Sequence, residues 1–171
     1  FADTWEEEGQ GIDIRVNGNL DLLNGARITA DNYGNGQGGS LQIQANALSL
    51  SGQHPSENGL STIATNNFAG GKGGNIKIDT PRLNLTPGLI QAATDQAGQA
   101  GNISIQAQRI LMRGLPELQA KLGINTSAHG TGHAGQITVE ATDEIALTEF
   151  SNISSATTGS GAGGEINLKT P

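Results

Sequence analysis

Apolar and polar residues alternate in six short stretches of the chain, and five of these stretches begin with a glycine and a polar residue. A clear copy is Gly74-Asn75-Ile76-Lys77-Ile78. Period-two alternation over several residues is typical of a half-buried β-strand. The first apolar positions of the six stretches are Ile12, Leu41, Ile76, Ile103, Ile137 and Ile166, and the second are Ile14, Ile43, Ile78, Ile105, Val139 and Leu168.

Two further apolar groups follow each of the first five stretches and predict a second and a third strand. The second strand carries the pairs Leu20/Leu22, Leu48/Leu50, Leu83/Leu85, Ile110/Met112 and Ile145/Leu147. The third strand is anchored by Ile28, Ile63, Ile90, Ile124 and Ile153, each followed two positions later by Ala30, Thr65, Ala92, Thr126 and Ser155. We call one such set of three strands a rung.

The link from each third strand to the next first strand has a constant length. It spans 13 positions in every copy (28 to 41, 63 to 76, 90 to 103, 124 to 137 and 153 to 166), and we call it the glycine corner (residues 29–40, 64–75, 91–102, 125–136 and 154–165). Two glycine columns recur in it: Gly36, Gly71, Gly98, Gly132 and Gly161, and then Gly39, Gly74, Gly101, Gly135 and Gly164. Glycine at fixed places predicts structural turns, with either a positive φ or no room for a Cβ.

Nearly all of the length variation lies in a second link, from the second strand to the third. The apolar anchors of these two strands are 8, 15, 7, 14 and 8 positions apart in the five rungs (20 to 28, 48 to 63, 83 to 90, 110 to 124 and 145 to 153). We call this link the variable corner (residues 23–27, 51–62, 86–89, 113–123 and 148–152). Insertions of this kind indicate surface loops on a repetitive scaffold.

A three-strand unit of this size cannot bury its apolar face alone and must stack on copies of itself. Because each strand resembles its counterpart one rung away, we expect parallel pairing with like residues in register. The sequence therefore predicts an all-β protein, a right-handed parallel β-helix (β-solenoid) with three short strands per rung and about 5.5 rungs. We expect residues 1–10 to be an irregular amino-terminal segment or cap. Residues 11–171 form the repeats, with rungs starting near 11, 40, 75, 102, 136 and 165.

The residue before each first strand is polar. This column contains Ser40, Asn75, Asn102, Gln136 and Glu165. Stacked polar side chains form hydrogen-bonded ladders along the stacking direction. We expect Glu165 to interrupt the ladder and to reach water.

Composition and charge exclude several classes of partner. The net charge is −7, the isoelectric point is about 4.8 and aromatic residues make up 3% of the chain. Neither nucleic acid nor an anionic lipid surface is therefore an expected partner, and no apolar run reaches bilayer length. Glu6, Glu7 and Glu8 stand where a secretory signal would be basic and then apolar, so we expect a cytosolic chain or a piece of a larger protein.

Two segments resemble a known family. Gly73 to Leu85 and Ala100 to Met112 are similar to the repeats of filamentous-haemagglutinin-like exoproteins, the secreted partners of bacterial two-partner secretion systems. Related repeats occur in the S-layer-like surface proteins of cyanobacteria and proteobacteria. The resemblance implies an extracellular or cell-surface rod with a structural or adhesive role. Its expected partners are neighbouring rungs, further copies of the chain and surface glycans. The amino-terminal secretion domain of that family is not recognisable in this sequence.

The alternative is a carbohydrate-active β-helix enzyme of the pectin-lyase-like type. Asp79 and Glu140 share an outward column with Gln106 between them, about 9.6 Å apart at two rung spacings, which suits an inverting glycosidase. We find no aromatic platform for a sugar in that column, so a solvated face of mixed charge is favoured. We predict no enzymatic activity, no catalytic residue and no cofactor.

Three groups in the glycine corners invite a binding hypothesis. His129 and His133 flank a short turn, but no acid or Cys lies near them in sequence, so we predict exposed histidines and no metal site. Asp31, Asn32 and Asn35 resemble calcium ligands, yet the calcium-binding nonapeptide is missing and turn-forming roles are favoured. Tyr33 and Phe68 occupy one column on adjacent rungs and are expected to stack.

The two long variable corners are candidate interaction loops. They span residues 51–62 and 114–123 and alternate with short corners. Loops on rigid scaffolds commonly carry binding residues, although they are also tolerated as decoration. The candidate residues are His54, Pro55, Glu57, Pro116, Glu117 and Lys121. In the second loop, Pro116 to Leu122 has the length and the initial proline of one or two helical turns.

Both ends of the predicted stack are expected to be adhesive. The last stretch, Gly164 to Pro171, repeats the pattern of Gly74 to Pro81 but has no second strand after it. An uncovered rung exposes unpaired backbone groups and apolar side chains. We therefore expect a segment of a longer rod, or end-to-end stacking into filaments. The residues expected at these contacts are Trp5, Ile12, Ile166 and Leu168.

Overall fold

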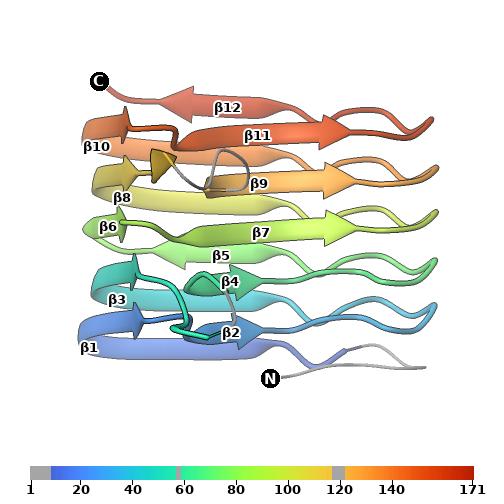
Figure 1. The fold of residues 1–171 in the computed structure, drawn as a ribbon, viewed down its shortest axis with the longest axis horizontal. Coiled ribbons are helices and arrows are strands. Elements are labelled where there is room, and N and C mark those ends of the chain that lie inside the picture. The colour runs from blue at the N-terminus through green and yellow to red at the C-terminus, as the bar shows by residue number, and fades with distance from the viewer. Residues whose placement is uncertain (1–8, 57–58, 117–121) are drawn as a thin grey trace.

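The computed structural model describes residues 9–56, 59–116 and 122–171, and these residues form an all-β protein with parallel sheets and no α-helix. The first sheet contains β1 (Ile12–Leu23), β3 (Leu41–Ser51), β5 (Ile76–Asp79), β6 (Arg82–Leu85), β8 (Ile103–Arg113), β10 (Ile137–Thr148) and β12 (Ile166–Lys169). The second sheet contains β2 (Arg27–Thr29), β4 (Thr62–Ala64), β7 (Leu89–Thr94), β9 (Gly123–Ala128) and β11 (Asn152–Thr157). Successive turns of the chain lie over one another (Figure 1).

The predicted parallel register is confirmed. Ile12 pairs with Leu41, Leu41 with Ile76, and the column continues through Ile103 and Ile137 to Ile166. In the second sheet Ile28, Ile63, Ile90, Ile124 and Ile153 are paired in the same way. We keep the word rung for residues 12–40, 41–75, 76–102, 103–136 and 137–165, with 166–171 as the start of a sixth.

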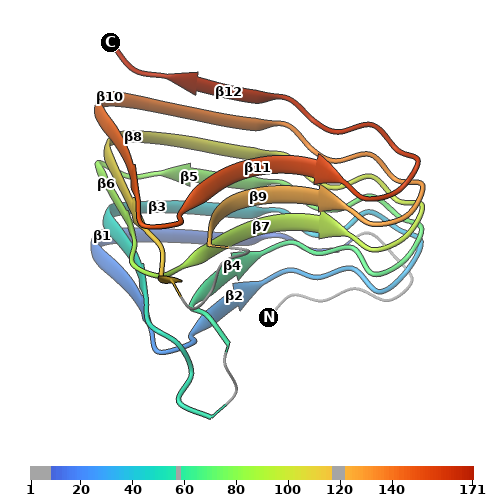
Figure 2. The same cartoon turned by 45° about the horizontal axis from the view of Figure 1, so that its top comes forward.

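The prediction of separate first and second strands is wrong for four of the five rungs. β1, β3, β8 and β10 each run through both predicted strands and bend between them, as Figure 2 shows. Only between β5 and β6 is the strand interrupted, at Thr80 and Pro81, because proline has no N–H for the ladder. β5 and β6 follow one another between β3 and β8, and each of them pairs with both of these strands. The four strands therefore form a closed ring of parallel pairings.

One extra residue in β1 and in β10 explains a small irregularity of the repeat. The pairing of β1 with β3 shifts between Val16 and Asn19, and that of β10 with β8 shifts between Ala141 and Glu144. Both shifts are β-bulges, in which two residues of one strand face one residue of its partner. They account for the first and fifth rungs having 8 positions from first to second strand where the others have 7.

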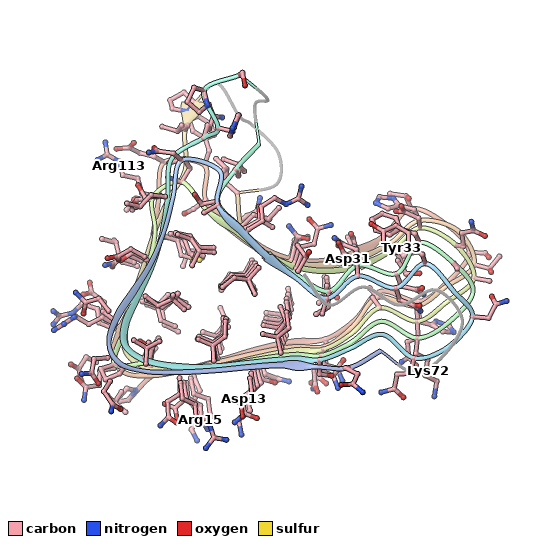
Figure 3. All side chains as sticks on the ribbon, turned by 90° about the horizontal axis from the view of Figure 1, so that it is seen from below. Asp13, Arg15, Asp31, Tyr33, Lys72 and Arg113 are labelled. Carbon is pink, nitrogen blue, oxygen red and sulfur yellow. The ribbon has the colours of Figure 1, made fainter. Side chains whose placement is uncertain are left out.

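The core consists of apolar columns stacked between the two sheets. In the middle rungs Leu41, Ile76, Ile103 and Ile137 are at most 1% exposed, and Leu48, Leu83 and Ile110 are fully buried. Seen along the stacking direction, the inward side chains superimpose as discrete columns (Figure 3). Each fully buried Ile or Leu contributes about 1.5–3 kcal/mol. Stability therefore comes from rung-on-rung contact and not from any single rung.

Candidate functional site

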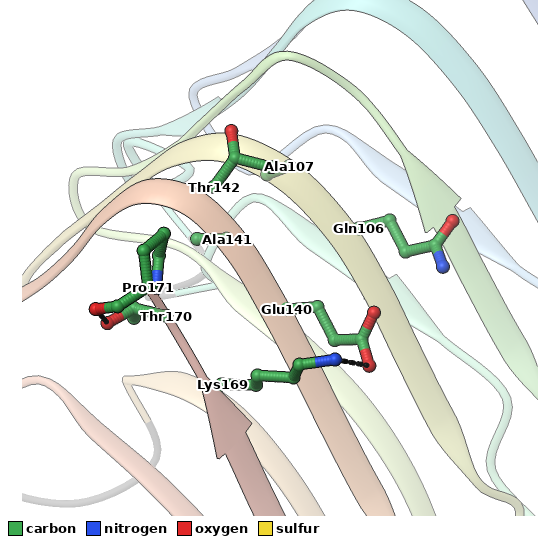
Figure 4. A pocket seen from close by; sticks show the side chains of 8 residues that line it. All are labelled: Gln106, Ala107, Glu140, Ala141, Thr142, Lys169, Thr170 and Pro171. Atoms are coloured by element: carbon green, nitrogen blue, oxygen red, sulfur yellow. Dashed lines mark hydrogen bonds and ion pairs between the residues drawn. The ribbon is translucent and has the colours of Figure 1, made fainter.

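The outer surface of the first sheet is hollowed along the line where its strands bend. One hollow of about 360 Å³ is lined by Arg15, Val16, Asn17, Gln44, Ala45, Asn46, Asp79 and Pro81. A second, of about 200 Å³, is lined by Asp79, Thr80, Pro81, Gln106, Ala107 and Gln108. A third, of about 420 Å³, is lined by Gln106, Ala107, Glu140, Ala141, Thr142, Lys169, Thr170 and Pro171 (Figure 4). Each hollow shares two lining residues with the next, so we treat them as one corner groove.

Small side chains at the bend make this groove. Its floor is the column Val16, Ala45, Thr80, Ala107, Ala141 and Thr170. Ala45 and Ala141 are 4% and 5% exposed, so these positions turn inward and leave little volume on the outside. The outward residues on either side of the bend then stand above the floor. The bulges in β1 and β10 lie at this bend.

One wall of the corner groove is the outward column that contains Asp79 and Glu140. Register places Asp79 beside Gln106 and Gln106 beside Glu140, which confirms the predicted separation of the two carboxylates by two rungs. Lys169 pairs with Glu140 in register, and its Nζ lies 3.9 Å from Glu140 Oε1 (Figure 4). The carboxylates therefore lie on one exposed face beside an amide and a lysine, and no aromatic residue lines the groove in the part of the chain that is described.

At the amino-terminal end of this column Arg15 is held by its neighbour Asp13. Arg15 Nη2 lies 2.9 Å from Asp13 Oδ2, and Nε lies 3.2 Å from Oδ1. This hydrogen bond, with the attraction of the charges, raises the pKa of Arg15 above its ordinary value. Both side chains point outward into solvent (Figure 3), so the pair adds little to stability.

The predicted glycine turns lie where adjacent rungs touch. A Cβ added to Gly101 would lie 1.8 Å from the carbonyl oxygen of Gly74, and one on Gly98 would lie 2.0 Å from that of Gly71. Similar or shorter distances recur at Gly132, Gly135, Gly161 and Gly164. Of the two explanations offered by the sequence, lack of room for a Cβ is correct. Positive φ is wrong for these columns, because the described glycines with positive φ are Gly25, Gly52, Gly123 and Gly130.

Hydroxyl and amide side chains close the glycine corner from inside. Thr65 Oγ1 donates to the carbonyl of Gly74, and Thr126 Oγ1 donates to that of Gly135 at 2.8 Å. The Asn32 amide donates to the carbonyl of Gly36 at 2.8 Å and to Asn67 Oδ1 at 3.1 Å. These contacts were not predicted, although Thr and Ser recur two positions after the third-strand anchor.

The polar ladder before the first strands is confirmed. The backbone N–H of Asn102 donates to Asn75 Oδ1, and that of Gln136 donates to Asn102 Oδ1, each at 2.8 Å. Glu165 is exposed as expected, but it does not interrupt the ladder. Its Oε2 accepts a hydrogen bond from Gln136 Nε2 at 3.0 Å.

The candidate metal residues have other partners. Asn32 Oδ1 accepts the N–H of Gly34, as expected for a turn-forming residue, and Asp31 Oδ1 accepts that of Asn66. His129 Nδ1 lies 2.9 Å from Thr158 Oγ1, and His133 Nδ1 accepts the N–H of Ala162. Over the described ranges no three His, Asp or Glu side chains are grouped closely enough to hold a metal ion.

The predicted aromatic stack is present. The ring centroids of Tyr33 and Phe68 are 4.9 Å apart with an interplanar angle of 18°, and each residue is 37% exposed. Figure 3 places Tyr33 on the outside of the glycine corner.

The candidate interaction loops are described in part. His54 lies in the first loop, where its N–H donates to the carbonyl of Gly59 and its Nδ1 lies 3.2 Å from Ser56 Oγ. Pro55 and Pro116 are exposed. Glu57, Glu117 and Lys121 lie outside the described residues, and so do residues 117–121 of the predicted helical turns. The loop that contains His54 projects from the stack below β2 and β4 (Figure 2).

The residues proposed for end stacking differ in exposure. Ile166 is 39% exposed and Leu168 is 52% exposed, whereas Ile12 is half-buried. Trp5 lies outside the described residues. β12 pairs with residues 137–140 of β10, and the second half of β10 has a partner on one side, β8. Leu147 in that half is 41% exposed.

An exposed feature beside the second loop was not predicted. Glu149 and Phe150 have φ of 47° and 63°, and Phe150 is 59% exposed. Arg113 Nε lies 2.8 Å from Glu149 Oε2, and this contact raises the pKa of Arg113. Non-glycine residues with positive φ carry no reliable mark in a sequence.

No family model, curated protein or solved structure matches the chain. The described residues include no apolar helix of bilayer-spanning length.

Proposed function

We propose that this chain is a stretch of right-handed parallel β-helix of about 5.5 rungs, with three faces per rung. The proposal is supported by the in-register columns of both sheets, which recur once per turn of the chain. Crossover connections between neighbouring parallel strands are almost always right-handed, which gives the hand.

We further propose a structural and adhesive role in a secreted or cell-surface bacterial rod similar to the filamentous-haemagglutinin-like exoproteins. The observation that carries this proposal is the repetition itself. The same apolar columns continue from Ile12 to Ile166, while the outward columns are mixed in charge and polarity. Such a chain adds length with every rung, and over the described residues no three His, Asp or Glu side chains are grouped closely enough to hold a metal ion.

We propose that a neighbouring rung or a further copy of the chain pairs with the edge formed by β12 and the second half of β10. This edge combines unpaired strand backbone with the exposed side chains of Leu147, Ile166 and Leu168. A further parallel strand with apolar residues at alternate positions would cover all three. The partner is a further rung or a second copy of the chain.

Antibody labelling of the organism that encodes the chain tests the proposed role. We expect antibodies raised against residues 9–171 to label intact cells or extracellular filaments in immunogold electron microscopy. Labelling confined to the cytoplasm of permeabilised cells would overturn the proposal.

Sedimentation velocity over a range of concentrations tests the association at the edge of β12 and β10. Leu168→Lys is expected to reduce self-association while leaving the circular dichroism spectrum unchanged.

A further inference from the structure

We infer that the corner groove binds a linear, uncharged polysaccharide that lies along the stacking direction. This inference rests on the proposed adhesive role and identifies the ligand class for it. The first support is shape. The groove runs along the outward column from Arg15 to Lys169. Its length is therefore five rung steps of about 4.8 Å, or about 24 Å in all. A long open groove fits an extended polymer and not a compact ligand.

The second support is the chemistry of the walls. Gln44, Gln106 and Gln108 are exposed along the groove, and their amides have no protein hydrogen-bond partner within the described residues. A primary amide both donates and accepts, so it matches a hydroxyl group, which does the same. Gln44 and Gln106 lie two rungs apart in one outward column, and Gln108 lies on the same strand as Gln106, on the other side of the bend. Amides at successive levels of the groove suit a polymer that presents hydroxyl groups at regular intervals.

The third support is the balance of charge. Arg15 and Lys169 are the cations of the groove, and Asp79 and Glu140 are its carboxylates. The two cations are already engaged, Arg15 with Asp13 and Lys169 with Glu140. The lining as a whole has no net charge, so it offers a polyanion no net attraction. An uncharged chain is therefore the best match.

The absence of an aromatic residue from the described lining sets how binding depends on ligand length. Without a stacking platform each sugar unit gains only a few hydrogen bonds in exchange for those it made with water. Binding then accumulates over successive rungs, as for linked weak contacts. We expect affinity to rise with every added sugar unit until the groove is filled.

The test is a titration of the ¹⁵N-labelled chain, followed by nuclear magnetic resonance, with cello- and manno-oligosaccharides of two to six units. We expect the side-chain amide signals of Gln44, Gln106 and Gln108 to shift, and the affinity to rise at least about tenfold from dimer to hexamer. Gln106→Ala should weaken hexamer binding about 2- to 10-fold. Gln42→Ala is the matched control, because Gln42 is exposed on the same face of β3 but lies outside the groove lining.

Several outcomes would overturn the inference. These are no shift with any of the neutral oligomers, equal affinity for dimer and hexamer, or tighter binding of a galacturonate hexamer than of the neutral hexamers. An equal loss of affinity in Gln42→Ala and Gln106→Ala would also contradict the groove as the site. None of these results bears on cell-surface labelling, so failure of this inference is distinguishable from failure of the proposed role.

Discussion

The variable corner leads from the first sheet to the second, and the glycine corner leads back. In the glycine corner backbone meets backbone directly between rungs, and a Cβ on Gly135 would lie 1.9 Å from the carbonyl oxygen of Gly101. In the variable corner the chain folds on itself, as where the N–H of His54 donates to the carbonyl of Gly59. Rungs also touch at the two ends of a variable corner, where a Cβ on Gly114 would lie 2.1 Å from the carbonyl oxygen of Glu149 and one on Gly123 would lie 2.1 Å from that of Asn152. Corner length is therefore constant where such contacts recur throughout the corner, and it varies where a loop leaves the stack between them.

Backbone conformation separates the two corners as well. Residues with positive φ gather in the variable corner, at Asn24, Gly25, Gly52, Gly123, Glu149 and Phe150. Within the described glycine corners Gly130 is the one residue of this kind. The glycine corner thus requires glycine mainly for space, and the variable corner uses residues that tolerate left-handed backbone.

The largest effect is expected from lengthening the two corners. Inserting Gly-Ser-Gly between Gln99 and Ala100 separates the hydrogen bonds that these residues make to Gly73 and His133, so we expect a loss of more than about 4 kcal/mol or no cooperative unfolding. The same insertion between the exposed Pro55 and Ser56 should cost about 0.5 kcal/mol or less. Urea denaturation followed by circular dichroism measures both, and similar costs would contradict the comparison.

A single methyl-bearing side chain in a glycine column is expected to have the next largest effect. Gly101→Val places atoms on the carbonyl of Gly74, and we expect a loss of about 3 kcal/mol or more. Gly70→Ser is the control, because its Cβ would meet only the Asn35 side-chain oxygen at 3.2 Å and should change stability by about 0.5 kcal/mol or less. The free energy of unfolding is read from urea titration. Equal losses would show that contact between rungs is not what the column requires.

Removal of a buried hydroxyl tests what closes the glycine corner. Thr126 is fully buried and donates to the carbonyl of Gly135, which also accepts a hydrogen bond from Ser155. Thr126→Val keeps the shape and removes the donor, so we expect a loss of about 1–2 kcal/mol. Thr131→Val, at an exposed position of the same corner, should change little. Faster amide hydrogen exchange near Gly135 in Thr126→Val would identify the cause.

The smallest effect is expected from the ion pair beside the variable corner. Arg113 and Glu149 are both exposed, so Glu149→Gln should leave the urea midpoint unchanged within replicate error. The contact raises the pKa of Arg113, so any contribution from that group is present at neutral pH, where Glu149 is ionised, and is lost as the pH rises into the strongly alkaline range. A marked shift in the urea midpoint of Glu149→Gln at neutral pH would show that the ion pair does stabilise the variable corner.

The register of the stack could be predicted from the sequence because each column repeats its own residue type. Ile, Leu or Val at 12, 41, 76, 103, 137 and 166 identifies the pairing without any knowledge of the loops. The continuity of strands was harder to predict, since β3 and β8 bend without a glycine or proline to mark the place. The extra residue in β1 and β10 was visible as a spacing of 8, but nothing local identified it as a bulge.

The candidate site was predicted only in fragments. The outward column of Asp79, Gln106 and Glu140 follows from alternation, and its order is confirmed by the pairing, which continues the column to Arg15 and Lys169. The corner groove itself depends on the direction in which Ala45, Ala107 and Ala141 turn at the bend. The bend of the strand in three dimensions decides that direction, and the alternation of apolar and polar residues along the sequence does not reveal it. For the same reason the glycine columns were located correctly while their physical cause remained open between two explanations.

The direction of the backbone hydrogen bonds governs how such a chain responds to pulling. Each hydrogen bond between rungs lies along the stacking direction. A force that pulls the two ends of the chain apart along this direction therefore loads the bonds of one rung at a time and not those of all strands together. The chain is expected to unravel by peeling, in steps set by the spacing of the first-sheet strands, 29, 35, 27, 34 and 29 residues. At about 3.3–3.6 Å per extended residue each step releases roughly 9–13 nm. A chain built in this way is expected to lengthen stepwise under load while the remaining rungs stay folded.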